Sequence, residues 1–165
     1  MSLPRKVLEK YVKDGCAFIE TGSRWGDTLI RAMETGGAYC AFGCEVDGLY
    51  AGVAKMHVAD YSNKISVDHQ DSVTWLRGFV ERKGNVGSVV FLDAHTETRT
   101  PVISELNVIH SWEVRPRAIL IDDIKLMEGW GVDYTLLFKM LMDMGYRVHY
   151  EDGARPEDIM VGVMP

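Results

Sequence analysis

Apolar residues recur with two different spacings along this chain, and the two spacings alternate from one end to the other. Short runs that are almost wholly apolar predict buried strands, whereas stretches with apolar residues three or four positions apart predict amphipathic helices. The predicted strands span residues 16–21, 38–46, 64–68, 87–94 and 117–122, and the predicted helices span 3–14, 26–34, 49–59, 72–82, 101–112 and 134–144. Two further β-like runs, 146–150 and 158–164, flank the polar turn EDGARPE and can pair as an antiparallel hairpin.

Strands that alternate with helices and are apolar on both faces are typical of a parallel sheet covered by helices on both sides. Because crossovers between parallel strands are right-handed, few topologies remain. We therefore expect an α/β fold with one doubly wound domain over residues 1–165, opened by a helix within residues 1–15 and closed by the hairpin. The pattern contains no internal repeat, low-complexity tract or interdomain linker.

The turn after the first predicted strand carries the sequence ETGSRWGDT. Gly22 and Gly26 allow the backbone to turn sharply and to approach a ligand closely. Glu20 ends the strand at the edge where open α/β sheets bind ligands, and Glu45 ends the next strand, where a carboxylate typically accepts hydrogen bonds from ribose hydroxyls. The G-x-x-x-G spacing differs from the G-x-G-x-x-G of dinucleotide-binding turns, so a nicotinamide cofactor is disfavoured.

Acidic residues follow the predicted strands with unusual regularity. They are Glu20, Glu45, Asp47, Asp68, Asp93, Asp122 and Asp123. The carboxyl ends of parallel strands open on one edge, so these acids gather at a single crevice, where they repel one another unless a cation or a hydroxyl-rich ligand is present. Each acid taken singly can instead cap the next helix, which suits Asp27 and Asp71 but accounts poorly for the whole set.

Three of these acids, Asp93, Asp122 and Asp123, form a cluster of their own, because two adjacent strands would place them side by side. Three carboxylates suit a hard divalent ion such as Mg²⁺, which lowers the pKa of a bound hydroxyl. His95 lies two residues beyond Asp93 and is a candidate general base; the alternative is a loop histidine bonded to the backbone. Trp130 lies beside the Asp122–Asp123 loop, where it either packs in the core or contacts a substrate.

Composition narrows the classes of partner. The net charge is −6 and no run of Lys or Arg is visible, so we expect no nucleic-acid partner. No segment has the apolar length of a membrane helix, and Cys16, Cys40 and Cys44 lie in apolar strand-like runs that indicate reduced, buried thiols in a cytoplasmic protein. The sequence is compatible with a homo-oligomer.

The succession FIETGSRWGDT, GCEVD, DHQDS, VVFLDAH and AILIDD resembles class I S-adenosylmethionine-dependent methyltransferases. Within them it is most similar to the metal-dependent O-methyltransferases of the catechol and macrocin groups. The resemblance covers about residues 16–165. It implies a Rossmann-like, doubly wound seven-stranded sheet with strand order 3-2-1-4-5-7-6, in which strand 7 is antiparallel.

The same resemblance implies roles for individual residues. Those implied to bind the cofactor are Glu20, Thr21, Gly22, Ser23, Gly26, Thr28, Glu45, Val46, Asp71, Ser72 and Asp93, with Glu45 at the ribose and Asp71 and Ser72 at the adenine. Asp93, Asp122 and Asp123 match the metal-binding acids. Asp93 and His95 are the implied catalytic residues, although His95 falls where some sugar O-methyltransferases have an acidic base.

We therefore expect S-adenosylmethionine-dependent, Mg²⁺-assisted O-methylation of a small hydroxylated acceptor, such as a sugar or a catechol-like diol. The alternative is a cofactor-binding module that has lost catalysis and acts through a partner. It is motivated by the region before the first strand, about 15 residues, which is shorter than in relatives. N-methylation of nucleic-acid bases is disfavoured because the fourth strand ends in Asp-Ala-His-Thr rather than Asn/Asp-Pro-Pro-Tyr/Phe.

Overall fold

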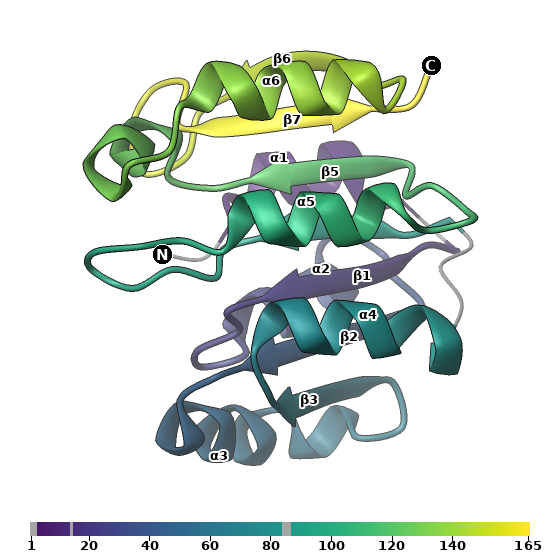
Figure 1. Ribbon diagram of the computed structural model, residues 1–165. Coiled ribbons are helices and arrows are strands. Elements are labelled where there is room, and N and C mark those ends of the chain that lie inside the picture. The colour runs from purple at the N-terminus through teal and green to yellow at the C-terminus, as the bar shows by residue number, and fades with distance from the viewer. Residues whose placement is uncertain (1–2, 14, 84–86) are drawn as a thin grey trace.

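The computed structural model describes residues 3–13, 15–83 and 87–165, and it contains one seven-stranded sheet (Figure 1). The strands are β1 (Ala17–Thr21), β2 (Cys40–Glu45), β3 (Ile65–His69), β4 (Val89–Leu92), β5 (Ala118–Ile121), β6 (Arg147–Glu151) and β7 (Ile159–Val163). The helices are α1 (Arg5–Tyr11), α2 (Asp27–Glu34), α3 (Gly48–His57), α4 (Ser72–Lys83), α5 (Val102–His110) and α6 (Tyr134–Asp143). Every predicted strand and helix is present, with ends that differ by a few residues.

The strand order is β3-β2-β1-β4-β5-β7-β6, as predicted. Neighbouring strands from β3 to β5 are parallel, and β7 is antiparallel to both β5 and β6. This order confirms the Rossmann-like sheet with a closing hairpin. Because β1 and β4 are adjacent, the loops that follow them lie side by side at the carboxyl edge of the sheet.

Two apolar clusters, one on each face of the sheet, form the core. Alternate residues of one strand point to opposite clusters: on β1, Ile19 packs on the side of α4, α5 and α6, and Phe18 packs on the side of α1, α2 and α3. Figure 1 shows α4, α5 and α6 in front of the sheet, with α1 and α2 behind it. Burial on both faces explains why the central strands read as continuous apolar runs.

Two short 3-10 helices were not predicted: η1 (Ala59–Tyr61) and η2 (Ile124–Trp130). The second follows β5, begins after Asp123 with its φ of +53°, and ends at Gly131 with a φ of +72°. A segment of this kind has no 3.6-residue period, so the apolar pattern cannot reveal it. Its position matters because it borders the carboxyl edge of the sheet.

Cys16, Cys40 and Cys44 are all buried, as predicted, and none of them forms a disulfide in the described part of the chain. None of the helices in the described part of the chain is both long and apolar enough to cross a membrane.

The turn after β1 depends on a close approach between two backbones. Gly22 has a φ of +75°, and a Cβ atom added there would lie 2.5 Å from the carbonyl oxygen of Asp93. Real Cβ atoms essentially never come so near, so only glycine fits between the turn and the end of β4. The predicted sharp turn at Gly22 is present, but the group that it approaches is the neighbouring strand end, and the predicted approach to a ligand stays a prediction.

Substitution of Gly22 by Ala should destabilise the protein more than substitution of Gly145. Both residues have positive φ, but a Cβ on Gly145 would meet nothing within 4 Å. We expect Gly145→Ala to cost about 1 kcal/mol through backbone strain alone. Gly22→Ala should cost roughly 1–3 kcal/mol more because the Asp93 carbonyl must also move. Urea denaturation measures both, and equal losses would contradict the tight contact.

Candidate functional site

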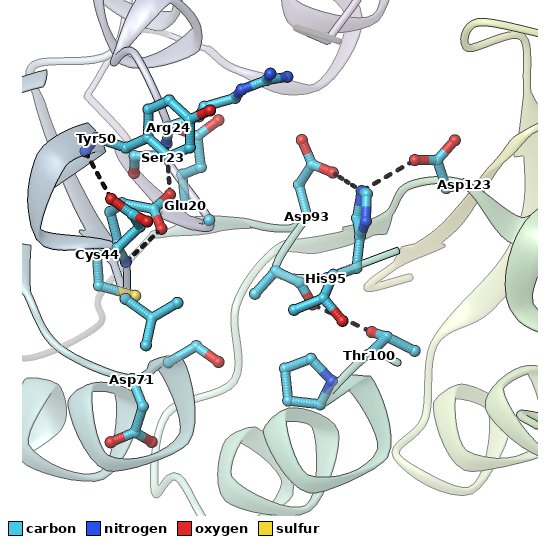
Figure 2. A pocket seen from close by; sticks show the side chains of 18 of the residues that line it. Glu20, Ser23, Arg24, Cys44, Tyr50, Asp71, Asp93, His95, Thr100 and Asp123 are labelled. Atoms are coloured by element: carbon cyan, nitrogen blue, oxygen red, sulfur yellow. Dashed lines mark hydrogen bonds and ion pairs between the residues drawn. The ribbon is translucent and has the colours of Figure 1, made fainter. Parts of the chain in front are cut away.

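The carboxyl ends of the strands open into a cavity of about 1320 Å³. Loops that follow β1, β2, β3, β4 and β5 all contribute to its lining. Small-molecule sites commonly have roughly 300–1,000 Å³, so this cavity has room for more than one ligand. Figure 2 shows its two ends: Glu20, Tyr50 and Asp71 on one side, and Asp93, His95 and Asp123 on the other.

Most of the predicted site residues line this cavity. They are Glu20, Gly22, Ser23, Thr28, Glu45, Val46, Asp71, Ser72, Asp93, His95 and Asp123. Thr21, Gly26 and Asp122 do not line it. Thr21 is fully buried behind the lining, and Gly26 provides the left-handed residue before α2. Asp122 is 8% exposed, and its Oδ1 accepts the backbone N–H of Asp123 at 2.9 Å.

Glu20 is a buried carboxyl group that faces the cavity without a full set of partners. It is only 2% exposed, and its Oε2 has no hydrogen-bond partner among the described residues. Burial, helped by the negative charge of Asp93, raises the pKa of Glu20 to about 8. A cationic ligand next to Glu20 would stabilise the ionised carboxylate against both burial and the charge of Asp93. This end of the cavity therefore favours a ligand with a positively charged group.

Glu45 is held by the backbone at the end of β2. Its Oε2 accepts the N–H of Arg24 and its Oε1 accepts the N–H of Asp47, each at 2.9 Å. Arg24 reaches this position with a φ of +46°, a conformation that non-glycine residues seldom adopt. The two hydrogen bonds fix the carboxylate and leave lone pairs that can accept hydrogen bonds from ligand hydroxyls.

Three of the other acids at this edge have partners within the protein. Asp47 Oδ1 caps α3 by accepting the N–H groups of Leu49 and Tyr50. Asp71 Oδ1 accepts the N–H of Thr74 at 2.9 Å, which lowers the pKa of the Asp71 carboxyl. Asp68 Oδ2 accepts the Trp75 Nε1–H at 2.7 Å. The capping alternative is therefore correct for Asp47 and Asp71. Fewer of the acids at this edge lack a partner within the protein than the sequence suggests.

At the other end of the cavity, His95 lies between two carboxylates. Its Nε2 is 3.3 Å from Asp93 Oδ1 and 3.1 Å from Asp123 Oδ2 (Figure 2). The left-handed conformation of Asp123, with a φ of +53°, lets it follow β5 and face the end of β4. One donor atom from each of these three residues lies within 4.8 Å of the others, a spacing that can hold a metal ion.

The His95 ring is fixed by its surroundings. Trp130 stacks on it, with ring centroids 4.7 Å apart and an interplanar angle of 25°. The Trp130 Nε1–H donates to the carbonyl oxygen of Glu97 at 3.1 Å, and the Thr100 hydroxyl donates to the Ala94 carbonyl at 3.2 Å. These contacts join the loop after β4 to η2 and support the position of the imidazole beside the two acids.

Hydrogen bonds to Asp123 and Asp93 raise the pKa of His95 to about 10. At neutral pH the imidazole is therefore protonated in the metal-free protein, and it has no lone pair with which to accept a proton. A histidine that acts as a general base must be neutral, so the role expected for His95 from the sequence requires loss of this proton and stays a prediction. A divalent cation would supply the same positive charge and would leave the imidazole neutral, so the three residues fit a metal ion as well.

Sequence reasoning missed Glu105, a buried acid below the cavity floor. Glu105 on α5 is 0% exposed, and neither of its oxygens accepts a well-formed hydrogen bond from a described residue. Burial raises the pKa of Glu105 to about 7, although the hydroxyls of Ser72 and Thr21 favour its ionised form. A signal was present: Glu105 falls on the apolar stripe of its helix, between Val102 and Leu106.

Two cationic residues of the lining, Arg24 and Arg99, were also missed. The Arg24 guanidinium lies 5.8 Å from the ring centre of Trp25 and 5.5 Å from that of Tyr50. No ion pair holds either arginine among the described residues. They are the only arginine or lysine residues of the described lining, which is otherwise rich in carboxylates.

The sequence matches no family model and no curated protein. The structure resembles that of TrmK from M. capricolum in complex with S-adenosylhomocysteine, with a TM-score of 0.67 and 12% identity over 99% of this chain and 67% of that one. Precorrin-6y C5,15-methyltransferase from Geobacter metallireducens GS-15 is similar at a TM-score of 0.67 and 11% identity, over 98% and 87% of the two chains. A putative caffeoyl-CoA O-methyltransferase from Staphylococcus aureus gives 0.66 and 12%, over 98% and 80%. At these identities the similarity shows the fold, which is that of class I methyltransferases.

The raised pKa of Glu105 predicts a pH-dependent loss of stability that Glu105→Gln removes. The carboxyl is neutral in both states below its unfolded pKa of about 4.5, so it has no effect there. As pH rises from about 4.5 through the folded pKa of about 7, the unfolded state gains stability by ionising. At pH 8 the wild type should be less stable than Glu105→Gln by up to about 3 kcal/mol, relative to their difference at pH 4.

Chemical denaturation at a series of pH values measures this difference. Glu20 and Asp122, whose pKa values are also raised, are present in both proteins and so cancel. A wild-type-to-variant difference that stays constant from pH 4 to pH 8 would contradict the burial of an unpaired carboxyl at this position.

Proposed function

We propose that this protein is an S-adenosylmethionine-dependent methyltransferase that methylates a hydroxyl group of a small acceptor with the help of a divalent cation. One observation carries the proposal: two groups of polar side chains line a single cavity. The carboxyl groups of Glu20 and Glu45 lie at one end. The cluster of Asp93, His95 and Asp123 lies at the other. Two centres of different chemistry in one large cavity suit a cofactor and an acceptor that must meet.

The end formed by β1 and β2 suits the cofactor. Glu45, fixed by two backbone N–H groups, would accept the ribose hydroxyls, and Glu20 would face the ammonium group. Arg24 and Arg99 are the lining groups that can pair with a carboxylate. When bound, the cofactor supplies an activated methyl group on its sulfonium centre.

The end formed by β4, β5 and η2 suits the acceptor. Asp93, His95 and Asp123 would hold a divalent cation, which would supply a lowered pKa for an acceptor hydroxyl bound to it. Trp130, Thr96 and Leu126 line the cavity next to this centre and would orient the acceptor. Because both ends belong to one cavity, much of the acceleration of methyl transfer would come from the proximity and orientation of cofactor and acceptor.

The charge of the cavity favours a small acceptor over a nucleic acid. The chain has a net charge of −6, and the charged residues of the lining are mainly acidic. A polyanion would be repelled by such a surface. The solved structures with this fold include a putative tRNA (m1A22) methyltransferase and a putative caffeoyl-CoA O-methyltransferase, so the fold alone does not choose the acceptor.

S-Adenosylmethionine or S-adenosylhomocysteine should raise the melting temperature, even in EDTA. At about 100 times the dissociation constant the stabilisation is about 2.7 kcal/mol, which corresponds to a shift of roughly 5–10 °C for a domain of this size. Glu45→Gln should weaken binding by roughly 10–100-fold because charge-assisted hydrogen bonds to the ribose are lost. NAD is the control ligand, and a larger shift with NAD than with S-adenosylmethionine would overturn the cofactor assignment.

Asp123→Asn should abolish methyl transfer to a panel of diols and leave S-adenosylmethionine binding within a few-fold of wild type. The reason is that Asp123 belongs to the acceptor end of the cavity and contributes one donor to the cation site. The measurement is S-adenosylhomocysteine release, with exposed Asp143→Asn as the control. Full activity in EDTA would refute the role of the cation, and binding without transfer to any diol would favour the non-catalytic module instead.

A further inference from the structure

We infer that the cation site formed by Asp93, His95 and Asp123 selects a first-row transition-metal ion, such as Mn²⁺, Fe²⁺, Co²⁺ or Zn²⁺, over Mg²⁺. The inference deepens the proposed function, on which it rests for the use of the ion in catalysis. The selectivity itself is a property of the folded chain and can be measured without cofactor or acceptor.

The first step is the identity of the donor atoms. The sequence predicts three carboxylates, Asp93, Asp122 and Asp123, which are an all-oxygen set. In the structure His95 Nε2 lies 3.3 Å from Asp93 Oδ1 and 3.1 Å from Asp123 Oδ2, whereas Asp122 does not line the cavity. Asp122 Oδ1 is instead engaged by the N–H of Asp123. The cluster therefore offers one nitrogen and two oxygen donors.

The second step is the preference of each ion. Mg²⁺ is a hard ion that takes oxygen ligands and gives up its water reluctantly. An imidazole nitrogen suits zinc, iron and other first-row ions, whose affinity for a nitrogen-containing site generally rises from Mn²⁺ towards Cu²⁺. Two carboxylates also suit Mn²⁺. Exchange of one carboxylate for an imidazole thus moves the preference away from Mg²⁺.

The third step is that the donors are already in place. The stacked Trp130 restrains the His95 ring, and the side chains of Asp93 and Asp123 are only 12% and 17% exposed. Asp93 Oδ1 is buried and has no hydrogen bond of good geometry among the described residues. Two carboxylates this close to each other need positive charge. The His95 imidazole supplies it when it is protonated, a metal ion would supply it in place of that proton, and Arg155 lies 3.8 Å from Asp123.

The fourth step concerns the open coordination positions. Three protein donors leave room on a four- to six-coordinate ion for water or an acceptor oxygen. All three residues line the same cavity as the proposed acceptor region, so those positions face an accessible space. A structural metal site would be closed by further protein ligands, and no such ligand joins this cluster among the described residues.

The test is metal binding to the full chain, stripped with EDTA and then dialysed, without cofactor. Calorimetric titrations with Mn²⁺, Co²⁺ and Mg²⁺ give the affinities, and the visible absorption of bound Co²⁺ reports whether a nitrogen donor is present. For the wild type we expect Mn²⁺ and Co²⁺ to bind at least roughly 10-fold more tightly than Mg²⁺. In His95→Asp this ratio should fall at least several-fold, and the Co²⁺ spectrum should change to that of an oxygen-ligated ion.

The matched control is His110→Asp, which makes the same exchange at an exposed position on α5. It should leave the affinity ratio and the Co²⁺ spectrum unchanged. Equal affinity of the wild type for Mg²⁺ and Mn²⁺, no metal binding at all, or an unchanged ratio in a folded His95→Asp protein would each overturn the inference. The proposed function fails separately, if the same preparation in EDTA does not bind S-adenosylmethionine.

Discussion

The concentration of negative charge at the carboxyl edge of the sheet is the constraint on which the site depends. Parallel strands end together, and in this chain they end in acids, so the topology alone brings like charges into one cavity. Such a set is unstable unless each carboxylate is hydrogen-bonded, protonated or paired with a cation. All three ways of stabilising a carboxyl group occur in this structure. Because they occur at different places, the cavity has regions of different chemistry.

Backbone N–H groups satisfy the acids nearest to α3 and α4, and they turn Glu45 into a rigid acceptor with lone pairs to spare. Glu20 lacks a full set of such donors, and burial raises its pKa to about 8 and that of the buried Glu105 to about 7. A cation, the protonated His95, satisfies Asp93 and Asp123. The three solutions therefore favour three kinds of contact: hydroxyl groups at Glu45, a cationic group at Glu20, and a metal ion in place of a proton at His95.

The sequence was sufficient for the strands and helices, because burial on both faces leaves a clear periodic record, whereas the sheet order came from the resemblance to a known family. It also placed most of the site residues at one edge, since strand ends can be read from the same pattern. It could not show which carboxylates face the cavity. That depends on backbone angles such as the φ of +53° at Asp123, which puts this residue, and not Asp122, next to His95. Glu105 was missed for a related reason: an acid on an apolar stripe reads as a break in the pattern until its burial is seen.

The two ends of the cavity also differ in how firmly the fold determines them. At the Glu45 end the contacts to its carboxylate come from backbone groups that the strand–turn–helix units position. At the His95 end the contacts come from side chains on the loop after β4 and on η2, held by the stacking of Trp130 and the Trp130–Glu97 hydrogen bond. Similar solved structures share this fold at 11–16% identity, so the fold tolerates very different side chains. Under the proposed function, the choice of acceptor would therefore depend on the loop at residues 93–101 and on η2, and changes there would alter specificity without disturbing the sheet.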